Sequence, residues 1–336
     1  FRPEQSRYTK TRYAPREVNE LTDQHGAIIG QFIDAALNRG LCVYFQISGA
    51  TPPGLRLQDV PLLPNGRRPD RMAETGSLAS PAIRNYNRAY VRDLCEHYPR
   101  ITGFRPDWPE YPCYRLDEAF QDFGPHAESW AASHGFEFVA NRECVGAFYD
   151  YLHGSLKNSD MEDLAAADRG KFTQASLLRR FPEFLEWLRL KRALSLDLLD
   201  HWREAITAYG GPEKELSANA FMTPFTLLTG FDFAGAADIC SAVSPKLYTM
   251  HWSAMVEFWG ADLLAHNPDL DETLLVKALA HLFDLGDEIN AQTLSDYGYP
   301  EPHEPHPSPD DCQARKIVQV CADVDGGTRV TPLLHG

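Results

Sequence analysis

The sequence predicts an α/β protein with a parallel sheet, in the form of a (β/α)8 TIM-type barrel with helical insertions in its βα loops. Three observations support this fold class. Continuous apolar runs, typical of strands buried on both faces, follow helical segments. The long loops and insertions come after the strands, where barrel enzymes carry their function. No GxGxxG motif follows a strand, which disfavours an open dinucleotide-binding sheet.

The amino-terminal part shows the helix-to-strand order most clearly. Apolar residues between 29 and 37 repeat with helical spacing, and Gly40 is expected to end that helix. Residues 41–47 then form an apolar run that predicts a buried strand. A long loop leads to Ser80 and Pro81, which are typical of a helix start. The next strand is expected at residues 101–104.

The rest of the chain continues this pattern around a mostly helical stretch between residues 116 and 210. The chain is therefore expected to form one barrel domain, residues 1–336, with a helical insertion at about 116–210. About five strands can be recognised, fewer than the eight of a closed barrel, so the barrel is either incomplete at the termini or has unrecognised strands there. Further strands are expected at 216–221, 239–250 and 330–334, and helices at 181–209, 256–264, 274–283 and 311–321.

Charge and cysteine usage narrow the class of protein. The formal net charge of −15 disfavours binding to nucleic acid or to an anionic membrane surface. Seven cysteines without CxxC spacing are typical of a reduced compartment, so a cytoplasmic location is expected. No apolar segment is long enough to cross a membrane and no signal peptide is recognised. Assembly into a homo-oligomer is left open.

Residues 103–112, with the sequence GFRPDWPEYP, are the strongest functional feature. A strand that ends abruptly in charged and aromatic residues places them at the carboxyl end of a sheet, where barrel and open α/β enzymes carry their chemistry. Asp107 and Glu110 are the candidate catalytic pair, because glycoside hydrolysis uses two carboxyl groups. Arg105 could hold a neighbouring carboxylate ionised, and a structural Arg105–Asp107 pair is the alternative.

Other strand ends contribute candidate substrate-binding residues. Aromatic side chains there can stack on sugar rings, His251 can bind a hydroxyl or orient a carboxylate, and polar residues within apolar strands need partners. The candidates are Trp108, Tyr111, Gln46, Asn219, Tyr248, His251 and Trp252. No metal and no cofactor are expected: residues 303–306 lack the helical HExxH spacing, and neither a P-loop nor GxSxG occurs.

On these residues the chain resembles clan A-type glycoside hydrolase barrels, in particular uncharacterised bacterial barrel proteins related to the family forty-two β-galactosidases. The similarity rests on residues 42–46, 107–111, 217–221, the helix around Trp202, and Tyr248. It implies that Glu110 is the general acid/base at the end of the fourth strand. Pro109 stands where the clan has Asn, and no carboxylate ends the last apolar run, so the nucleophile is unassigned.

A second resemblance concerns residues 103–107 alone. GFRPD is similar to the fourth-strand motif of the α-amylase clan, in which the Asp is the nucleophile and the Arg supports it. This similarity implies that Asp107 attacks the sugar. The sequence therefore predicts an enzyme, a glycoside hydrolase acting on a small saccharide or oligosaccharide. A non-catalytic carbohydrate-binding barrel and a barrel lyase or isomerase with His251 as base are the alternatives.

Overall fold

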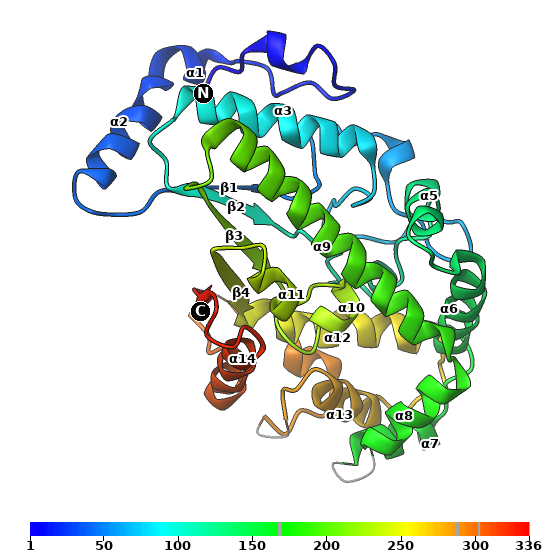
Figure 1. Cartoon of the computed structure of the whole chain (residues 1–336). Coiled ribbons are helices and arrows are strands. Elements are labelled where there is room, and N and C mark those ends of the chain that lie inside the picture. The colour runs from blue at the N-terminus through cyan, green and yellow to red at the C-terminus, as the bar shows by residue number, and fades with distance from the viewer. Residues whose placement is uncertain (167–169, 287–288, 302, 336) are drawn as a thin grey trace.

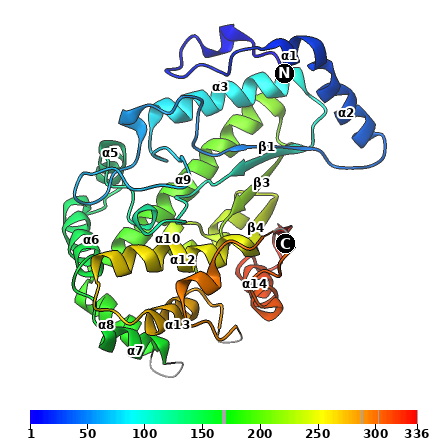
Figure 2. The same cartoon turned by 180° about the vertical axis from the view of Figure 1, so that it is seen from behind.

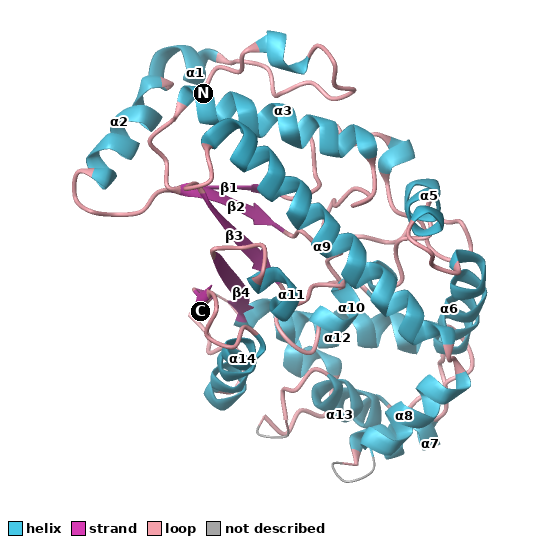
Figure 3. Ribbon diagram, in the orientation of Figure 1, coloured by secondary structure: helices cyan, strands magenta, loops and turns pink. Residues whose placement is uncertain are grey.

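A computed structural model describes residues 1–166, 170–286, 289–301 and 303–335. The chain forms a parallel sheet surrounded by many helices, as Figures 1 and 3 show. The sheet order is β1-β2-β3-β4-β5, and β6 also pairs with β4. The strands are β1 (Tyr44–Ser48), β2 (Gly103–Asp107), β3 (Glu215–Ala220), β4 (Ala242–Tyr248), β5 (Arg329–Val330) and β6 (Leu333–His335).

The expected strands are present with shifted bounds. The strand expected at residues 41–47 begins only at Tyr44, so that Leu41 and Cys42 are exposed rather than buried. The strand expected at 101–104 starts at Gly103 and runs on to Asp107. The strand expected at 239–250 is limited to β4, because residues 249–250 already belong to α12. The strand expected at 330–334 is divided into β5 and β6. Within the described residues β1 pairs with neither β5 nor β6, so closure into a barrel is not seen.

Helices precede and follow the strands as the sequence suggests. Ser80 caps α3 by accepting a hydrogen bond from the Ile83 N–H, and Gly40 follows α2 at a positive φ of 74°. The remaining helices lie in the segments that connect the strands, and most of the helical residues lie between β2 and β3. Before β2 lie α1 (Glu20–His25), α2 (Ala27–Leu37), α3 (Pro81–His97) and the short 3-10 helices η1 (Gln5–Tyr8) and η2 (Leu57–Asp59).

The described residues of the stretch expected to be mostly helical, between residues 116 and 210, are mostly helical. It comprises α4 (Leu116–Ala119), α5 (Pro125–Ser133), α6 (Phe138–Leu152), α7 (Asn158–Ala165), α8 (Gly170–Arg180) and α9 (Glu183–Gly210). The later helices are α10 (Thr226–Thr229), α11 (Phe233–Ala237), α12 (Thr249–His266), α13 (Glu272–Leu282), η3 (Leu294–Tyr297) and α14 (Asp310–Asp323). None of the described helices is long and apolar enough to span a bilayer.

The two faces of the sheet differ in chemistry. One face carries buried apolar side chains such as Phe104, Leu216 and Val243, and α9 packs on β3 and lies against α3 on this side. The strand registers place the polar side chains on the other face. Figure 2 shows the molecule from behind. Because successive strand residues alternate between faces, the polar set on the central strands is Arg105, Asp107, Glu215, Ser217, Asn219, Ser244, Lys246 and Tyr248.

The polar face is curved as in a barrel. Arg329 of β5 forms an ion pair with Glu215 of β3 and donates a hydrogen bond of 3.2 Å to the Tyr44 hydroxyl of β1. A side chain on one outer strand therefore reaches the other outer strand. In a barrel, side chains from alternate strands meet in layers in the same way.

Close pairing of β2 with β3 depends on a glycine. A Cβ on Gly103 would overlap the Glu215 carbonyl of the neighbouring strand. We expect Gly103→Ala to lower the free energy of unfolding by about 1–3 kcal/mol, because the strands must move apart. Gly30→Ala in α2 is the matched control: it has open space and should be stabilising by about 1 kcal/mol. Urea unfolding gives the free energy of unfolding of both variants. Equal changes in the two variants would contradict the role of Gly103 in strand pairing.

Candidate functional site

Asp107 lies at the carboxyl end of β2, where the backbone leaves the sheet. Trp108 follows it with a φ of 52°, in the left-handed region that non-glycine residues rarely adopt. Its N–H donates a hydrogen bond of 3.0 Å to the Asn219 carbonyl on β3. This turn ends the strand and keeps the Asp107 carboxylate at the edge, with 22% of its side chain exposed.

Three side chains from three different strands converge on the Asp107 carboxylate. The Lys246 ammonium forms an ion pair with Oδ1, and the Asn219 amide donates to the same oxygen at 2.8 Å. The Gln46 amide donates to Oδ2 at 3.3 Å. Lys246 is on β4 and reaches Asp107 across β3, which the curvature of the sheet allows. We call Asp107, Gln46, Asn219 and Lys246 the edge cluster.

Lys246 is the member of the edge cluster that sequence reasoning missed. Its side chain is only 4% exposed, and its Nζ lies 4.0 Å from the centre of the Trp108 ring. Burial lowers the pKa of Lys246, and the negative charge of Asp107 acts in the opposite direction. A lysine within the apolar run of β4 was the available signal, of the same kind that marked Gln46 and Asn219.

Two polar atoms beside Asp107 lack partners within the described part of the chain. Asn219 is completely buried, yet its Oδ1 accepts no hydrogen bond there. The indole N–H of Trp108 is likewise buried without an acceptor. Buried polar atoms in native proteins are nearly always hydrogen-bonded. A ligand hydroxyl or a water bound beside either atom would supply the missing partner.

Glu110 is close in sequence to Asp107 but is fully buried. Its Oε1 accepts a hydrogen bond of 2.6 Å from the Phe221 N–H, and its Oε2 is bonded to the Thr229 hydroxyl. Burial raises the pKa of Glu110 to about 7, although these two hydrogen bonds lower it. These two hydrogen bonds hold the carboxyl group in the interior, next to the end of β3.

Aromatic rings form a wall beside the edge cluster. Trp108 and Tyr114 meet edge to face with ring centres 6.1 Å apart, and the His251 ring lies 5.1 Å from that of Tyr114. Tyr248 and Tyr299 approach the same histidine at 5.4 and 6.0 Å. His251 lies in the first turn of α12 rather than in a loop. Tyr299, which is 46% exposed, was not recognised from the sequence.

Two residues expected in the site are buried and make their contacts outside the edge cluster. Tyr111 is buried, where its hydroxyl accepts from the Leu78 N–H and donates to Asp122, both at 3.1 Å. Trp252 is also buried, with the Lys316 ammonium 5.3 Å from its ring centre.

Arg105 stacks over the Tyr44 ring at 5.6 Å and forms no ion pair with Asp107, both described residues. Lys246, rather than Arg105, forms the ion pair with Asp107.

An apolar cavity of about 400 Å³ lies among the helices. It is lined by residues such as Phe148 of α6, Leu188 of α9 and Phe225 at the start of α10. None of the edge cluster lines it. Its walls carry little polar surface that could orient a hydrophilic substrate. This cavity therefore lacks the polar groups that the edge cluster has.

Comparison with known proteins gives limited information. No family model and no curated protein matches the chain. The β-galactosidase of the psychrophilic Marinomonas ef1 matches 74% of the chain with a TM-score of 0.42 and 15% identity. The cold-adapted β-galactosidase of Rahnella sp. R3 matches 76% with a TM-score of 0.41 and 13% identity. The chain matches 36% of each of those proteins, and at this similarity they say nothing about its activity.

Proposed function

We propose that the edge cluster binds a saccharide and that the chain is a glycoside hydrolase. The observation that carries the proposal is the accessible Asp107 carboxylate, held by Lys246, Asn219 and Gln46 beside the Trp108 ring. Sugars present hydroxyl groups that both donate and accept hydrogen bonds. Their C–H faces can contact the negative face of an aromatic ring. A few convergent polar groups beside aromatic rings are typical of small-molecule sites.

In the proposed reaction two carboxyl groups divide the work. Asp107 is the nucleophile or the electrostatic partner of the developing positive charge, because its carboxylate is partly exposed and lies at the carboxyl end of β2. Glu110 is the general acid/base, and a pKa of about 7 suits a group that must give and take a proton near neutral pH. Its carboxyl would have to exchange the bonds to Phe221 and Thr229 for substrate.

Saccharide binding without hydrolysis is the second candidate, and the burial of Glu110 favours it. The Glu110 carboxyl has no exposed surface and both of its oxygens are occupied. A hydrolase needs two carboxyl groups that flank the scissile bond. If Glu110 stays where it is on ligand binding, Asp107 alone cannot supply both roles.

The Glu110→Gln variant separates these two functions. We expect the wild-type chain to bind an oligosaccharide from a panel and to release reducing ends. The variant should keep its affinity while turnover falls by at least about 100-fold, since general acid–base catalysis contributes about 10²–10⁴-fold. Calorimetric titration measures binding, and a reducing-end assay measures turnover.

Three results would change the assignment. Binding without reducing ends in the wild type would favour the non-catalytic candidate. Unchanged turnover in Glu110→Gln would remove Glu110 from the mechanism. Absence of both binding and turnover across α- and β-linked oligosaccharides would contradict the saccharide proposal itself. Glu215→Gln, on the same sheet face but paired with Arg329, is the control and should behave as wild type.

A further inference from the structure

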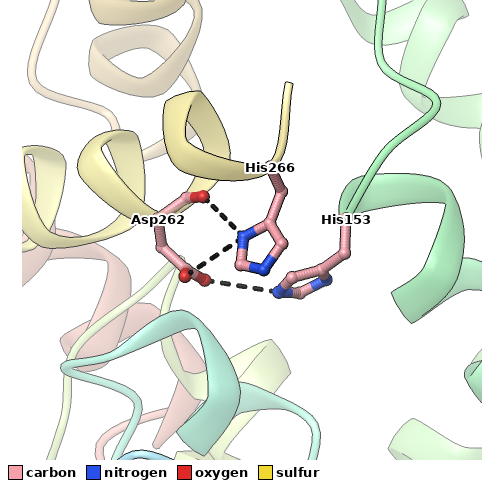
Figure 4. A group of neighbouring side chains, drawn as sticks. All are labelled: His153, Asp262 and His266. Carbon is pink, nitrogen blue, oxygen red and sulfur yellow. Dashed lines mark hydrogen bonds and ion pairs between the residues drawn. The ribbon is translucent and has the colours of Figure 1, made fainter. Parts of the chain in front are cut away.

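Two histidines and an aspartate come together far from the edge cluster, where the ends of two helices meet (Figure 4). His153 directly follows α6, and Asp262 and His266 lie on the last turns of α12. One ligand atom from each side chain lies within 4.8 Å of the others. Asp262 and His266 are four residues apart, so both project from one face of their helix.

The hydrogen bonds of the two histidines fix which ring nitrogens are available. His153 Nδ1 lies 2.8 Å from the Tyr149 carbonyl, and His266 Nδ1 lies 2.9 Å from the Asp262 carbonyl. A carbonyl only accepts, so each Nδ1 must carry the proton that it donates. This leaves Nε2 of each ring available. Metal-binding histidines typically donate their other N–H to such a carbonyl, which sets the ring orientation.

The Asp262 carboxylate faces one of these nitrogens directly. His153 Nε2 lies 3.3 Å from Asp262 Oδ2. If the His153 imidazole is neutral, the lone pair of its Nε2 faces a lone pair of Asp262 Oδ2 at this distance, which is repulsive. The contact is favourable only if His153 is protonated or if a cation lies between the two atoms. In Figure 4 the other ring nitrogen of His266 is on the side toward His153. A proton on His153 satisfies one contact, whereas a metal ion satisfies all three side chains.

We propose that His153, Asp262 and His266 bind a zinc ion. Imidazole nitrogen and carboxylate oxygen are ordinary zinc ligands, and three protein ligands leave a fourth position for water. The two histidines favour zinc over magnesium or calcium, which prefer oxygen ligands. The exposed fraction of the side chains rises from 8% for His153 to 45% for His266, so an ion can enter from solvent.

The proposed zinc ion stabilises the contact between the end of α6 and the end of α12. Asn267 already bridges the same two segments, since its amide donates to the Leu152 carbonyl at 2.8 Å and its Oδ1 accepts from the Leu156 N–H at 3.1 Å. His251 lies at the opposite end of α12, which at 1.5 Å per residue is roughly 25 Å long. The zinc ion therefore takes no part in chemistry at the edge cluster.

The test uses the full chain after treatment with a chelator, titrated with zinc chloride in a calorimeter. We expect one zinc ion per chain and a thermal unfolding midpoint that rises with zinc concentration. Asp262→Asn and His266→Ala should each lower the zinc affinity at least about 10-fold, since each removes one of three ligands. Asp262→Asn preserves side-chain shape, and His266 is half exposed, so neither change disrupts packing.

His97→Ala is the matched control. His97 Nδ1 donates to the carbonyl four residues earlier at 2.9 Å, as in the proposed zinc site, and lies 3.2 Å from the Asp93 carboxylate. Among the described residues, His97 and Asp93 belong to no group of three potential metal ligands. This variant should bind zinc as the wild type does. No saturable zinc binding, or binding that survives in both Asp262→Asn and His266→Ala, would overturn the proposal in favour of a protonated His153.

Cobalt binding distinguishes this site from the cysteines of the chain. Cobalt should bind with the same stoichiometry and without the near-ultraviolet charge-transfer band that thiolate ligands produce. A strong thiolate band that persists in His266→Ala would place the metal on cysteines and contradict the assignment.

Discussion

Replacing Asp107 with Asn is expected to lower saccharide affinity by about 10- to 100-fold. The carboxylate is the acceptor on which Lys246, Asn219 and Gln46 converge. A hydrogen bond to a charged group contributes about 1.5–3 kcal/mol, which corresponds to this loss. Calorimetric titration with the oligosaccharide that the wild-type chain binds measures the change.

The same substitution should lower stability as well as affinity. Lys246 is 4% exposed, and without the Asp107 charge its ammonium would lack its counter-ion in a buried place. Breaking a fully buried pair costs about 3–5 kcal/mol. Because Asp107 is partly exposed, solvent screening reduces the expected cost to about 1–2 kcal/mol. Denaturant unfolding at neutral pH measures it.

Glu215→Gln is the control for both effects of Asp107→Asn. Glu215 is an acidic residue on the same face of the sheet and is paired with Arg329, but it lies at the amino end of β3. It should leave saccharide affinity unchanged. Equal losses in the two variants would show that the whole polar face, rather than its carboxyl end, determines binding. Wild-type affinity in Asp107→Asn would remove Asp107 from the site.

Glu110→Gln is expected to abolish part of the pH dependence of stability. Burial raises the pKa of Glu110 in the folded chain from 4.5 to about 7, so between these values the folded state binds the proton more strongly than the unfolded state does. Its contribution is fully present below pH 4.5 and is lost as pH rises through 7. A shift of this size corresponds to roughly 3 kcal/mol over that window.

The glutamine variant mimics the protonated acid at every pH. Its amide N–H₂ can donate to the Thr229 hydroxyl, as the carboxylic acid would, while its carbonyl accepts from the Phe221 N–H. The difference in unfolding free energy between wild type and variant should therefore change by roughly 3 kcal/mol between pH 4.5 and 8.5. Urea unfolding at several pH values gives this difference.

The comparison with wild type also removes the contribution of Glu118. Burial raises the pKa of Glu118 to about 7 too, so the wild-type chain has a second source of the same decline. Glu118 is present in both proteins, and its effect cancels in the difference. Parallel pH profiles for wild type and Glu110→Gln would contradict the burial of a titrating Glu110.

The sequence predicted the elements that local patterns determine. Apolar runs after helices gave the parallel strands, and the abrupt change to charged residues after Phe104 located the candidate site at the end of β2. Gln46 and Asn219, polar residues within apolar strands, do contact Asp107. The strands could be predicted because strand periodicity and strand ends are readable over a few residues. The expected role of Gln46 and Asn219 in binding substrate stays a prediction.

Features that depend on the three-dimensional path of the chain were not predicted. Lys246 reaches Asp107 across β3 only because the sheet is curved. Glu110 is buried two residues after the positive φ of Trp108, and no residue pattern specifies either feature. His153 and Asp262, 109 residues apart, meet only through helix packing. Sequence spacing alone does not bring these two residues together.

A crystal structure of the chain with a bound oligosaccharide tests the central claim most directly. We expect a sugar ring at the carboxyl end of the sheet, with hydroxyl groups bonded to Asp107 and to Asn219 Oδ1 and a ring face against Trp108. A sugar bound elsewhere on the chain, with the edge cluster untouched, would contradict it.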